Sequence, residues 1–137
     1  MNVAVRYYSK TGNTKKLAQA IATALNVEMQ DVSVPLTEKT DIVFLGSAVY
    51  AAGIDESVKR FVAENKEKIG TLVNFSTAAV LSSTYKQVQK VAKEHGVKMA
   101  EAQFQCRGAF AMLHKGRPNA DDLSRAQAFA KDVVALK

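Results

Sequence analysis

Apolar residues along the 137-residue chain switch repeatedly between two spacings. Runs rich in β-branched and aromatic residues are typical of strands, and they occupy residues 3–8, 42–46, 72–76 and 104–110, with a marginal fifth run at 27–32. Between these runs apolar residues recur every three to four positions, as in amphipathic helices, in stretches that begin at Leu17, Ile54, Tyr85 and Leu123. The pattern predicts strands and helices in alternation.

This alternation is typical of the crossover connections that join parallel strands. We therefore predict an α/β fold with a doubly wound, five-stranded parallel sheet covered by helices on both faces. The connection at residues 33–40 is shortened, because so few residues, Pro35 among them, cannot form a full helical crossover. A turn or short helix is expected there. The chain shows no linker or internal repeat, so residues 1–137 are expected to form a single domain.

The start of the last helix is marked by its residue types. Pro118 precedes Asn119, which is a favoured capping residue, and Asp121 and Asp122 follow it. Negative charge in the first turn of a helix is favoured by the helix dipole. A helix beginning just after Asn119 is therefore expected.

The composition is that of a globular protein, with 47% apolar and 23% charged residues and a formal net charge of +6. Most of the positive excess lies in the second half of the chain, where Lys86, Lys90 and Lys93 share one face of a predicted helix. No stacking aromatic residues accompany these lysines, so a solvated surface is favoured over a nucleic-acid contact. We expect no nucleic-acid partner.

Signals for membranes, disulfides and metals are lacking in the sequence. The longest apolar runs are far shorter than the roughly 20 residues that span a bilayer, and the N-terminus carries no secretory signal, so a cytoplasmic protein is expected. Cys106 is the single cysteine and is expected to be a small buried residue. His95 and His114 are far apart in the sequence and belong to no recognised metal-binding or triad motif, so neither a metal site nor a catalytic triad is predicted.

Arg6 is an anomaly, because it lies in the first predicted strand where an apolar residue is expected. The favoured interpretation is an ion pair with an acid such as Asp31 or Asp41 beneath a helix end. A contact with a cofactor or partner is the alternative.

The loop after the first strand is the main candidate site, since ligands of open parallel sheets bind outside the carboxyl ends of the strands. Its residues are Ser9, Lys10, Thr11, Gly12, Asn13 and Thr14, and a predicted helix follows directly. Gly12 would let the backbone approach a ligand, the helix N-terminus offers N–H groups, and the hydroxyls would donate to phosphate oxygens. Ordinary loops and helix caps use the same residue types.

The string from Tyr7 to Thr14 resembles the phosphate-binding signature of the flavodoxin family, S/T-x-T-G-N-T, at every fixed position. It matches neither the nucleotide P-loop nor the dinucleotide fingerprint. The resemblance implies a flavodoxin-like fold with strand order 2-1-3-4-5. It also implies FMN as the cofactor, with its phosphate held by residues 9–14.

Two further loops resemble the segments that surround the flavin ring in this family. Residues 46–53 resemble the loop that lines the isoalloxazine, and the implied contacts are Ser47, Ala48, Val49, Tyr50 and Gly53, with Tyr50 as the stacking aromatic. After the fourth strand, the implied contacts to the pyrimidine edge are Ser76, Thr77 and Ala78. The second aromatic of longer members is missing, so Leu81 or Tyr85 covers the other ring face, or that face is open.

The resemblance implies an FMN protein that acts in electron transfer with a redox protein as its partner. Typical flavodoxins are acidic whereas this chain is basic, which admits an acidic partner. Two alternatives stay open: an FMN-dependent NAD(P)H:quinone-type reductase, and a binding module without a cofactor. An electron carrier is favoured over a self-sufficient enzyme, and a monomer or weak dimer is expected.

Overall fold

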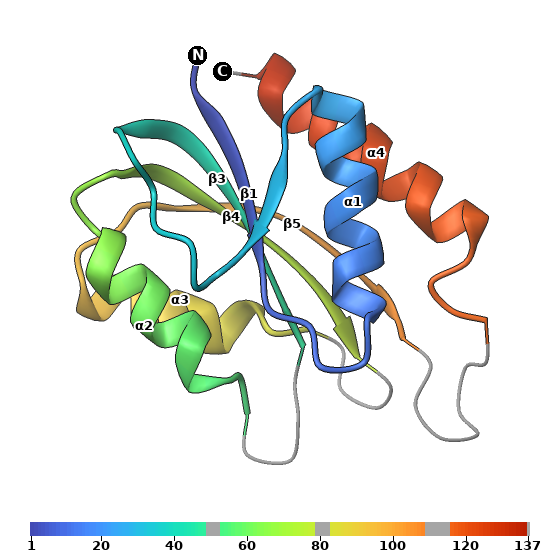
Figure 1. Cartoon of the computed structure of the whole chain (residues 1–137), viewed down its shortest axis with the longest axis horizontal. Helices are drawn as coiled ribbons and strands as arrows, with labels where there is room; N and C mark the ends of the chain where they lie inside the picture. Colours follow the sequence, from blue (N-terminus) through green and yellow to red (C-terminus); the bar gives the residue numbers. More distant parts are fainter. Residues whose placement is uncertain (49–52, 79–82, 109–115, 137) are drawn as a thin grey trace.

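A computed structural model of the protein describes residues 1–48, 53–78, 83–108 and 116–136. Five parallel strands form one sheet in the order β2-β1-β3-β4-β5. The strands are β1 (Val3–Tyr7), β2 (Met29–Asp31), β3 (Thr40–Ala48), β4 (Ile69–Ala78) and β5 (Met99–Arg107). The doubly wound parallel sheet and its strand order are confirmed (Figure 1).

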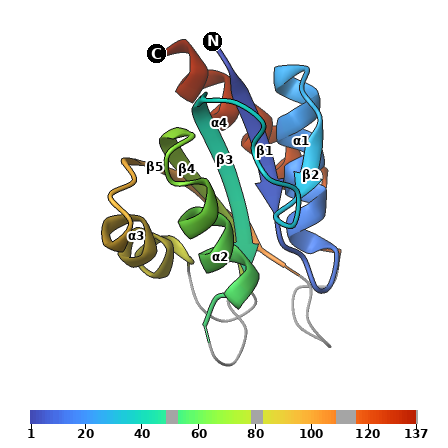
Figure 2. The same cartoon turned by 60° about the vertical axis from the view of Figure 1, so that its left-hand side comes forward.

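Two helices cover each face of the sheet (Figures 1 and 2). One face carries α1 (Asn13–Leu25) and α4 (Ala120–Ala135), and the other carries α2 (Glu56–Asn65) and α3 (Tyr85–Glu94). The central strand β3 alternates between the two cores, because successive side chains of a strand point to opposite faces. Phe44 is buried on the α1 and α4 side, whereas Val43 and Leu45 are buried on the α2 and α3 side.

The short connection between β2 and β3 covers the sheet without a helix. Val32 and Leu36 occupy the core on the α2 and α3 side, and Leu36 N–H donates to Asn65 Oδ1 at 2.9 Å. Arg6 is 8% exposed and donates to the carbonyl oxygens of Val34 at 2.9 Å and Pro35 at 3.3 Å. The predicted ion pair with Asp31 or Asp41 is therefore wrong. Arg6 instead donates its hydrogen bonds to backbone carbonyl groups that this helix-free segment exposes.

The carboxylates suggested for Arg6 have other roles. Asp31 accepts from the backbone N–H of Ser33 at 2.8 Å, and Asp41 accepts from the backbone N–H of Asn2 at 2.7 Å. The first bond holds the turn just after β2, and the second joins the residue before β1 to the start of β3. Arg6 therefore fixes the connection that replaces a crossover helix.

Helix α4 begins as the sequence predicts. Asn119 and Asp122 form a reciprocal capping box, and Asp122 is 1% exposed. The Asp122 carboxylate also accepts from Arg117 Nη2 and from Arg125 Nη2, each at 2.8 Å. The Arg117 hydrogen bonds lower the pKa of Asp122 despite its burial, which by itself raises that pKa.

We expect Asp122→Asn to cost about 2 kcal/mol of unfolding free energy at pH 7, because it leaves two guanidinium groups without their carboxylate and weakens the cap. The folded-state pKa is depressed, so the stabilisation is present above the unfolded pKa of roughly 4 and is lost as pH falls through the folded pKa. Urea unfolding at pH 7 and at pH 3 measures this. A difference between variant and wild type that does not shrink at pH 3 would contradict it.

Candidate functional site

The carboxyl ends of β1, β3 and β4 meet at the lower edge of the sheet in Figure 1, opposite the two chain ends. The loop that follows β1 is attached to β3 by a hydrogen bond from Tyr8 N–H to Gly46 O at 3.1 Å. Chain reversal into α1 then occurs at Gly12, whose φ is +93°, a conformation that suits glycine. The structure therefore places the start of α1 at the carboxyl edge of the sheet.

The N-terminus of α1 is open to an anion. Its N-cap residue, Gly12, has no side chain to cap it, and its first turn carries no acidic residue. By contrast, Asp55 caps α2 by accepting from Ser57 N–H at 2.9 Å, and α4 has its capping box. The first backbone N–H groups of a helix lack partners within the helix and carry positive potential. A phosphate group fits this helix end, with Lys10 and Thr11 exposed beside it.

Ser9 shapes the loop from within. Its Oγ accepts a hydrogen bond from Gly12 N–H at 2.9 Å, so the hydroxyl proton of Ser9 can still be donated to another group. Ser9 is half-buried. This geometry is compatible with the predicted role of Ser9 as a donor to phosphate.

Thr14 is 1% exposed and joins three of the predicted site segments. Its Oγ1 lies 2.9 Å from Thr77 Oγ1 and 3.5 Å from Ser47 O. A hydroxyl has a single proton, so these contacts compete with a bond to phosphate. The structure thus brings Thr14, Ser47 and Thr77 together and gives Thr14 a role in attaching α1 to β3 and β4.

A second polar cluster lies on the opposite face of the same sheet edge. Thr84 Oγ1 accepts from Ser47 Oγ at 2.9 Å and from Asn74 Nδ2 at 3.1 Å. Thr84 N–H contacts Ser76 Oγ at 3.4 Å, and all four residues are buried. The side chains of Ser47 and Ser76 therefore hold the ends of β3 and β4 in place. Asn74 was not among the predicted site residues, although a polar residue inside an apolar strand was a visible signal.

Two glycines permit close packing beneath the site. A Cβ at Gly46 would overlap the Phe75 ring and lie 2.9 Å from Thr14 Cγ2. A Cβ at Gly108 would lie 2.9 Å from Asn13 Nδ2. The second contact shows that the end of β5 lies against the start of α1, which sequence analysis did not identify.

The predicted ring-binding residues are placed only in part. Ala48 and Ala78 end β3 and β4 and are buried, and Gly53 has a φ of +98°. Val49 and Tyr50 lie outside the described residues, as do Leu81 and His114. Tyr85 donates its hydroxyl to Ala100 O at 3.0 Å, along β5.

The loops after β1 and β3 are close enough to interact electrostatically. The Ser57 hydroxyl and backbone N–H lower the pKa of Asp55, and the charges of Arg60 and Lys10 lower it further. A cation of the first loop and the carboxylate that caps α2 face the same edge.

Cys106 is buried at the end of β5, as expected, and burial raises the pKa of its thiol to about 11. The described residues contain no group of side chains arranged to hold a metal ion. Across the described segments, every helix is too short or too polar to span a membrane.

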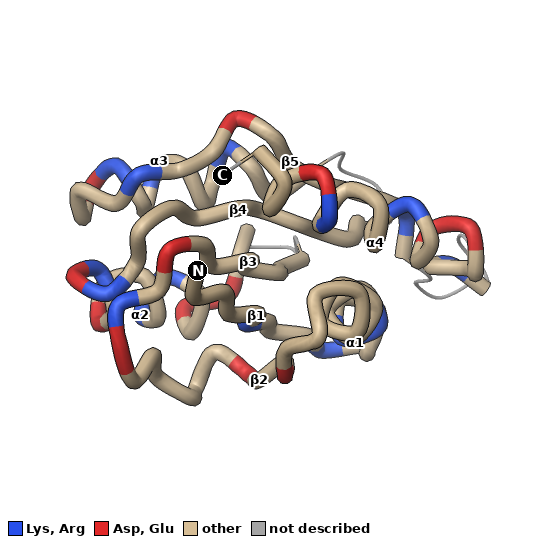
Figure 3. The backbone as a smooth tube through the Cα atoms, turned by 90° about the horizontal axis from the view of Figure 1, so that it is seen from above, with Lys and Arg blue, Asp and Glu red and all other residues tan. Residues whose placement is uncertain are grey.

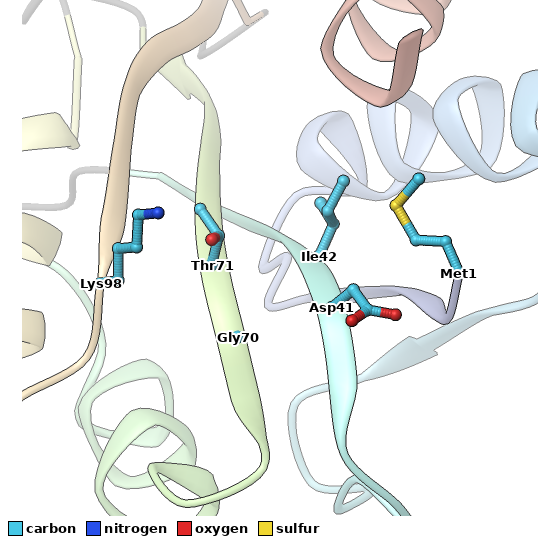
Figure 4. Close-up of a pocket in the computed structure, with 6 residues that line it drawn as sticks. All are labelled: Met1, Asp41, Ile42, Gly70, Thr71 and Lys98. Carbon is cyan, nitrogen blue, oxygen red and sulfur yellow. The ribbon is translucent and has the colours of Figure 1, made fainter. Parts of the chain in front are cut away.

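An open groove lies at the opposite, amino edge of the sheet (Figure 4). Its lining residues are Met1, Asp41, Ile42, Gly70, Thr71 and Lys98. Asp41 already accepts from Asn2 N–H, so this carboxylate is used within the fold. The groove contains none of the predicted site residues.

Known proteins resemble this chain along almost its whole length. An uncharacterized protein of Methanocaldococcus jannaschii is 29% identical over 136 residues, which cover 89% of this chain and 90% of that protein. A flavodoxin from the domain Archaea superposes with a TM-score of 0.79 at 15% identity, covering 98% of this chain and 97% of the other.

Two further solved structures share the fold. Flavodoxin 1 from Bacillus cereus has a TM-score of 0.75 at 16% identity, covering 98% of both chains. Rubredoxin oxygen:oxidoreductase from Desulfovibrio gigas has a TM-score of 0.75 at 14% identity, covering 98% of this chain and 35% of that enzyme. A family model described as a flavodoxin domain matches residues 4–126, and the chain therefore belongs to the flavodoxin family.

Proposed function

We propose that this protein binds FMN at the carboxyl edge of the sheet and acts as an electron carrier. The observation that carries the proposal is the N-terminus of α1, where the N-cap residue Gly12 has no capping side chain, the first turn has no acidic residue, and Thr11 beside it is exposed. A helix end of this kind stabilises a phosphate dianion. Membership of the flavodoxin family supports FMN as the source of that phosphate.

The phosphate subsite of this proposal is the loop of residues 9–14. Backbone N–H groups at the start of α1 and the hydroxyls of Ser9 and Thr11 would donate to the phosphate, with Lys10 nearby. Thr14 contributes by fixing the helix against Thr77 and Ser47. Asn13 is buried beside Gly108 at the same helix end.

The ring subsite of the proposal follows β3 and β4. Its residues are Ser47, Ala48, Val49, Tyr50, Gly53, Ser76, Thr77 and Ala78. The Thr84 cluster supports this arrangement because it fixes Ser47 and Ser76, and with them the direction in which both loops leave the sheet. Tyr50 would stack on the flavin ring.

The flavin, when bound, supplies the redox chemistry. The protein's part is to bind the phosphate, orient the ring and exclude water from one side of it. None of these three tasks requires a catalytic acid, base or nucleophile. The proposal therefore assigns no catalytic residue, and it includes a cytoplasmic location and a redox protein as partner.

Titration of the apoprotein with three flavins tests the cofactor assignment. We expect FMN to bind at least 100-fold more tightly than riboflavin, because hydrogen bonds to a charged group contribute roughly 1.5–3 kcal/mol each and riboflavin lacks the phosphate. FAD is expected to bind more weakly than FMN, because the site is shaped for one terminal phosphate. Isothermal titration calorimetry gives the three dissociation constants.

Equal affinities for FMN and riboflavin would contradict a phosphate site at α1. A protein that takes up none of the three flavins would favour the binding module without a cofactor. Steady oxidation of NADH or NADPH by the FMN-loaded protein alone, with a quinone as acceptor, would favour a reductase over an electron carrier.

A further inference from the structure

Thr84 is the N-cap residue of α3, yet its side chain does not cap the helix. Threonine is a favoured capping residue, because its hydroxyl oxygen can accept from the first free N–H groups of a helix. Here Ser83 Oγ accepts the bond from Tyr85 N–H instead, at 3.0 Å. The Thr84 hydroxyl is therefore left for bonds to the sheet.

Asn74 binds that hydroxyl from within β4. Asn74 Nδ2 donates to Thr84 Oγ1 at 3.1 Å, and Thr84 Oγ1 donates to Asn74 Oδ1 at 3.4 Å. Ser47 Oγ of β3 donates to the same Thr84 oxygen at 2.9 Å. A hydroxyl group has one proton and two lone pairs, so these three bonds use its full hydrogen-bonding capacity.

Side chains attach the start of α3 to a third strand as well. Ser83 Oγ donates to Gln103 Oε1 of β5 at 2.7 Å, and the Tyr85 hydroxyl donates to Ala100 O of the same strand. By contrast, α2 and α4 are capped by residues at their own N-termini. The start of α3 is thus fixed to β3, β4 and β5 by side-chain hydrogen bonds.

These polar residues lie in an otherwise apolar layer. Asn74 and Thr84 are 0% exposed, and the neighbour of Asn74 on β3 is the buried Leu45. β4 has no charged residue and runs between α2 and α3 on one side and α1 and α4 on the other (Figure 3). Replacing both partners of a buried hydrogen bond by apolar groups of the same shape can be nearly neutral for stability. Stability alone therefore does not require Asn74 and Thr84.

What the hydrogen bonds add is direction. Hydrogen bonds have preferred angles, and a fully satisfied buried network favours one arrangement of the segments that it joins. This network joins the end of β3 through Ser47, the end of β4 through Ser76 and the start of α3 at Thr84. Ser47 and Ser76 belong to the proposed ring subsite, whereas Asn74 and Thr84 do not.

We propose that Asn74 and Thr84 are positioning residues for the flavin ring. This inference rests on the proposed function and deepens it. Both side chains are fully buried on the α2 and α3 face and act through Ser47 and Ser76. When the strand ends are fixed before the ring binds, less conformational freedom is lost on binding, and affinity rises. The phosphate subsite at α1 lies on the other face of the sheet.

Riboflavin and inorganic phosphate test the two subsites separately. The double variant Asn74→Leu with Thr84→Val removes the amide and the hydroxyl and nearly keeps their volumes. We expect its riboflavin affinity, measured by quenching of flavin fluorescence, to fall by about 10-fold or more. Its affinity for inorganic phosphate, followed by the amide shifts of residues 9–14, should change less than about 3-fold.

Two controls separate positioning from stability. Thr84→Ser keeps the hydroxyl and should keep riboflavin affinity within about 3-fold of wild type. Val91→Ala removes buried apolar atoms from the same helix and leaves the network intact. This variant should unfold at a lower urea concentration, yet its folded form should bind riboflavin within about 2-fold of wild type.

A folded double variant that binds riboflavin as tightly as wild type would overturn the proposal and leave the network a purely structural role. An equal loss of riboflavin affinity in Val91→Ala would also overturn it, because lost stability would then explain the effect. If the double variant does not fold, Thr84→Val is compared with Thr84→Ser. Equal riboflavin affinities of those two variants would again overturn the proposal.

Failure of the flavin assignment is detected separately. If the wild-type protein binds neither FMN nor riboflavin, the proposed function fails, and amide hydrogen exchange of the apoprotein still tests whether the network fixes the strand ends. We expect the amides of Ala48 and Ala78 to exchange about 10-fold faster in the double variant than in Val91→Ala. Equal exchange rates in these two variants would show that the network does not position the strand ends.

Discussion

Thr11→Asp should weaken FMN binding by at least 100-fold while stabilising the apoprotein. Thr11 is exposed and immediately precedes Gly12, the residue at the N-terminus of α1. A carboxylate there would face the phosphate, and two like unit charges about 5 Å apart repel by roughly 3 kcal/mol at an effective dielectric constant near 20. The same carboxylate interacts favourably with the empty helix end, by about 0.3–1 kcal/mol. The two effects therefore have opposite signs.

Calorimetric titration and urea unfolding of the apoprotein measure the two effects. Thr11→Asn is the matched control, because asparagine has nearly the same shape as aspartate but no charge. This variant should change FMN affinity less than 10-fold. Riboflavin should bind Thr11→Asp as well as wild type. A loss of riboflavin affinity equal to the loss of FMN affinity would show that residue 11 acts on the loop as a whole and not on a phosphate.

Gly46→Ala should be among the most destabilising single substitutions in the sheet, costing about 3 kcal/mol of unfolding free energy. Gly46 lies in the central strand β3, where the new Cβ would overlap the Phe75 ring, which is fully buried. Adding a methyl group to a well-packed core commonly costs 1–3 kcal/mol, and here the rigid ring cannot move away cheaply. Contact with Thr14 at 2.9 Å should also disturb the start of α1.

A double-mutant cycle with Phe75→Leu tests the cause. The smaller side chain leaves space for the Cβ, so Gly46→Ala should cost less than about 1 kcal/mol in that background. Urea unfolding of the apoproteins gives the values without a contribution from flavin binding. A cost that is the same in both backgrounds would place the strain in the backbone and not against Phe75.

Much of the fold follows from local patterns in the chain. The alternation of strand and helix spacing predicted the parallel sheet, because those spacings reflect which residues face a core. Strand ends were less predictable. β3 and β4 continue through Ser47 and Thr77, since a parallel ladder is held by backbone hydrogen bonds that polar residues also make. Asn119 and Asp122 marked the start of α4 because capping depends on only a few adjacent residues.

The tertiary structure decided which residues that lie far apart in the chain come into contact. The sequence by itself determined that residues 9–14 open a helix after a strand, and so that an anion-binding loop was expected. Only the fold showed that the Thr14 hydroxyl contacts Thr77, that Arg6 binds the carbonyl groups of Val34 and Pro35, and that Gly108 lies against Asn13. Such contacts depend on which strands are neighbours in the sheet, and that is a property of the topology and not of any local pattern in the chain.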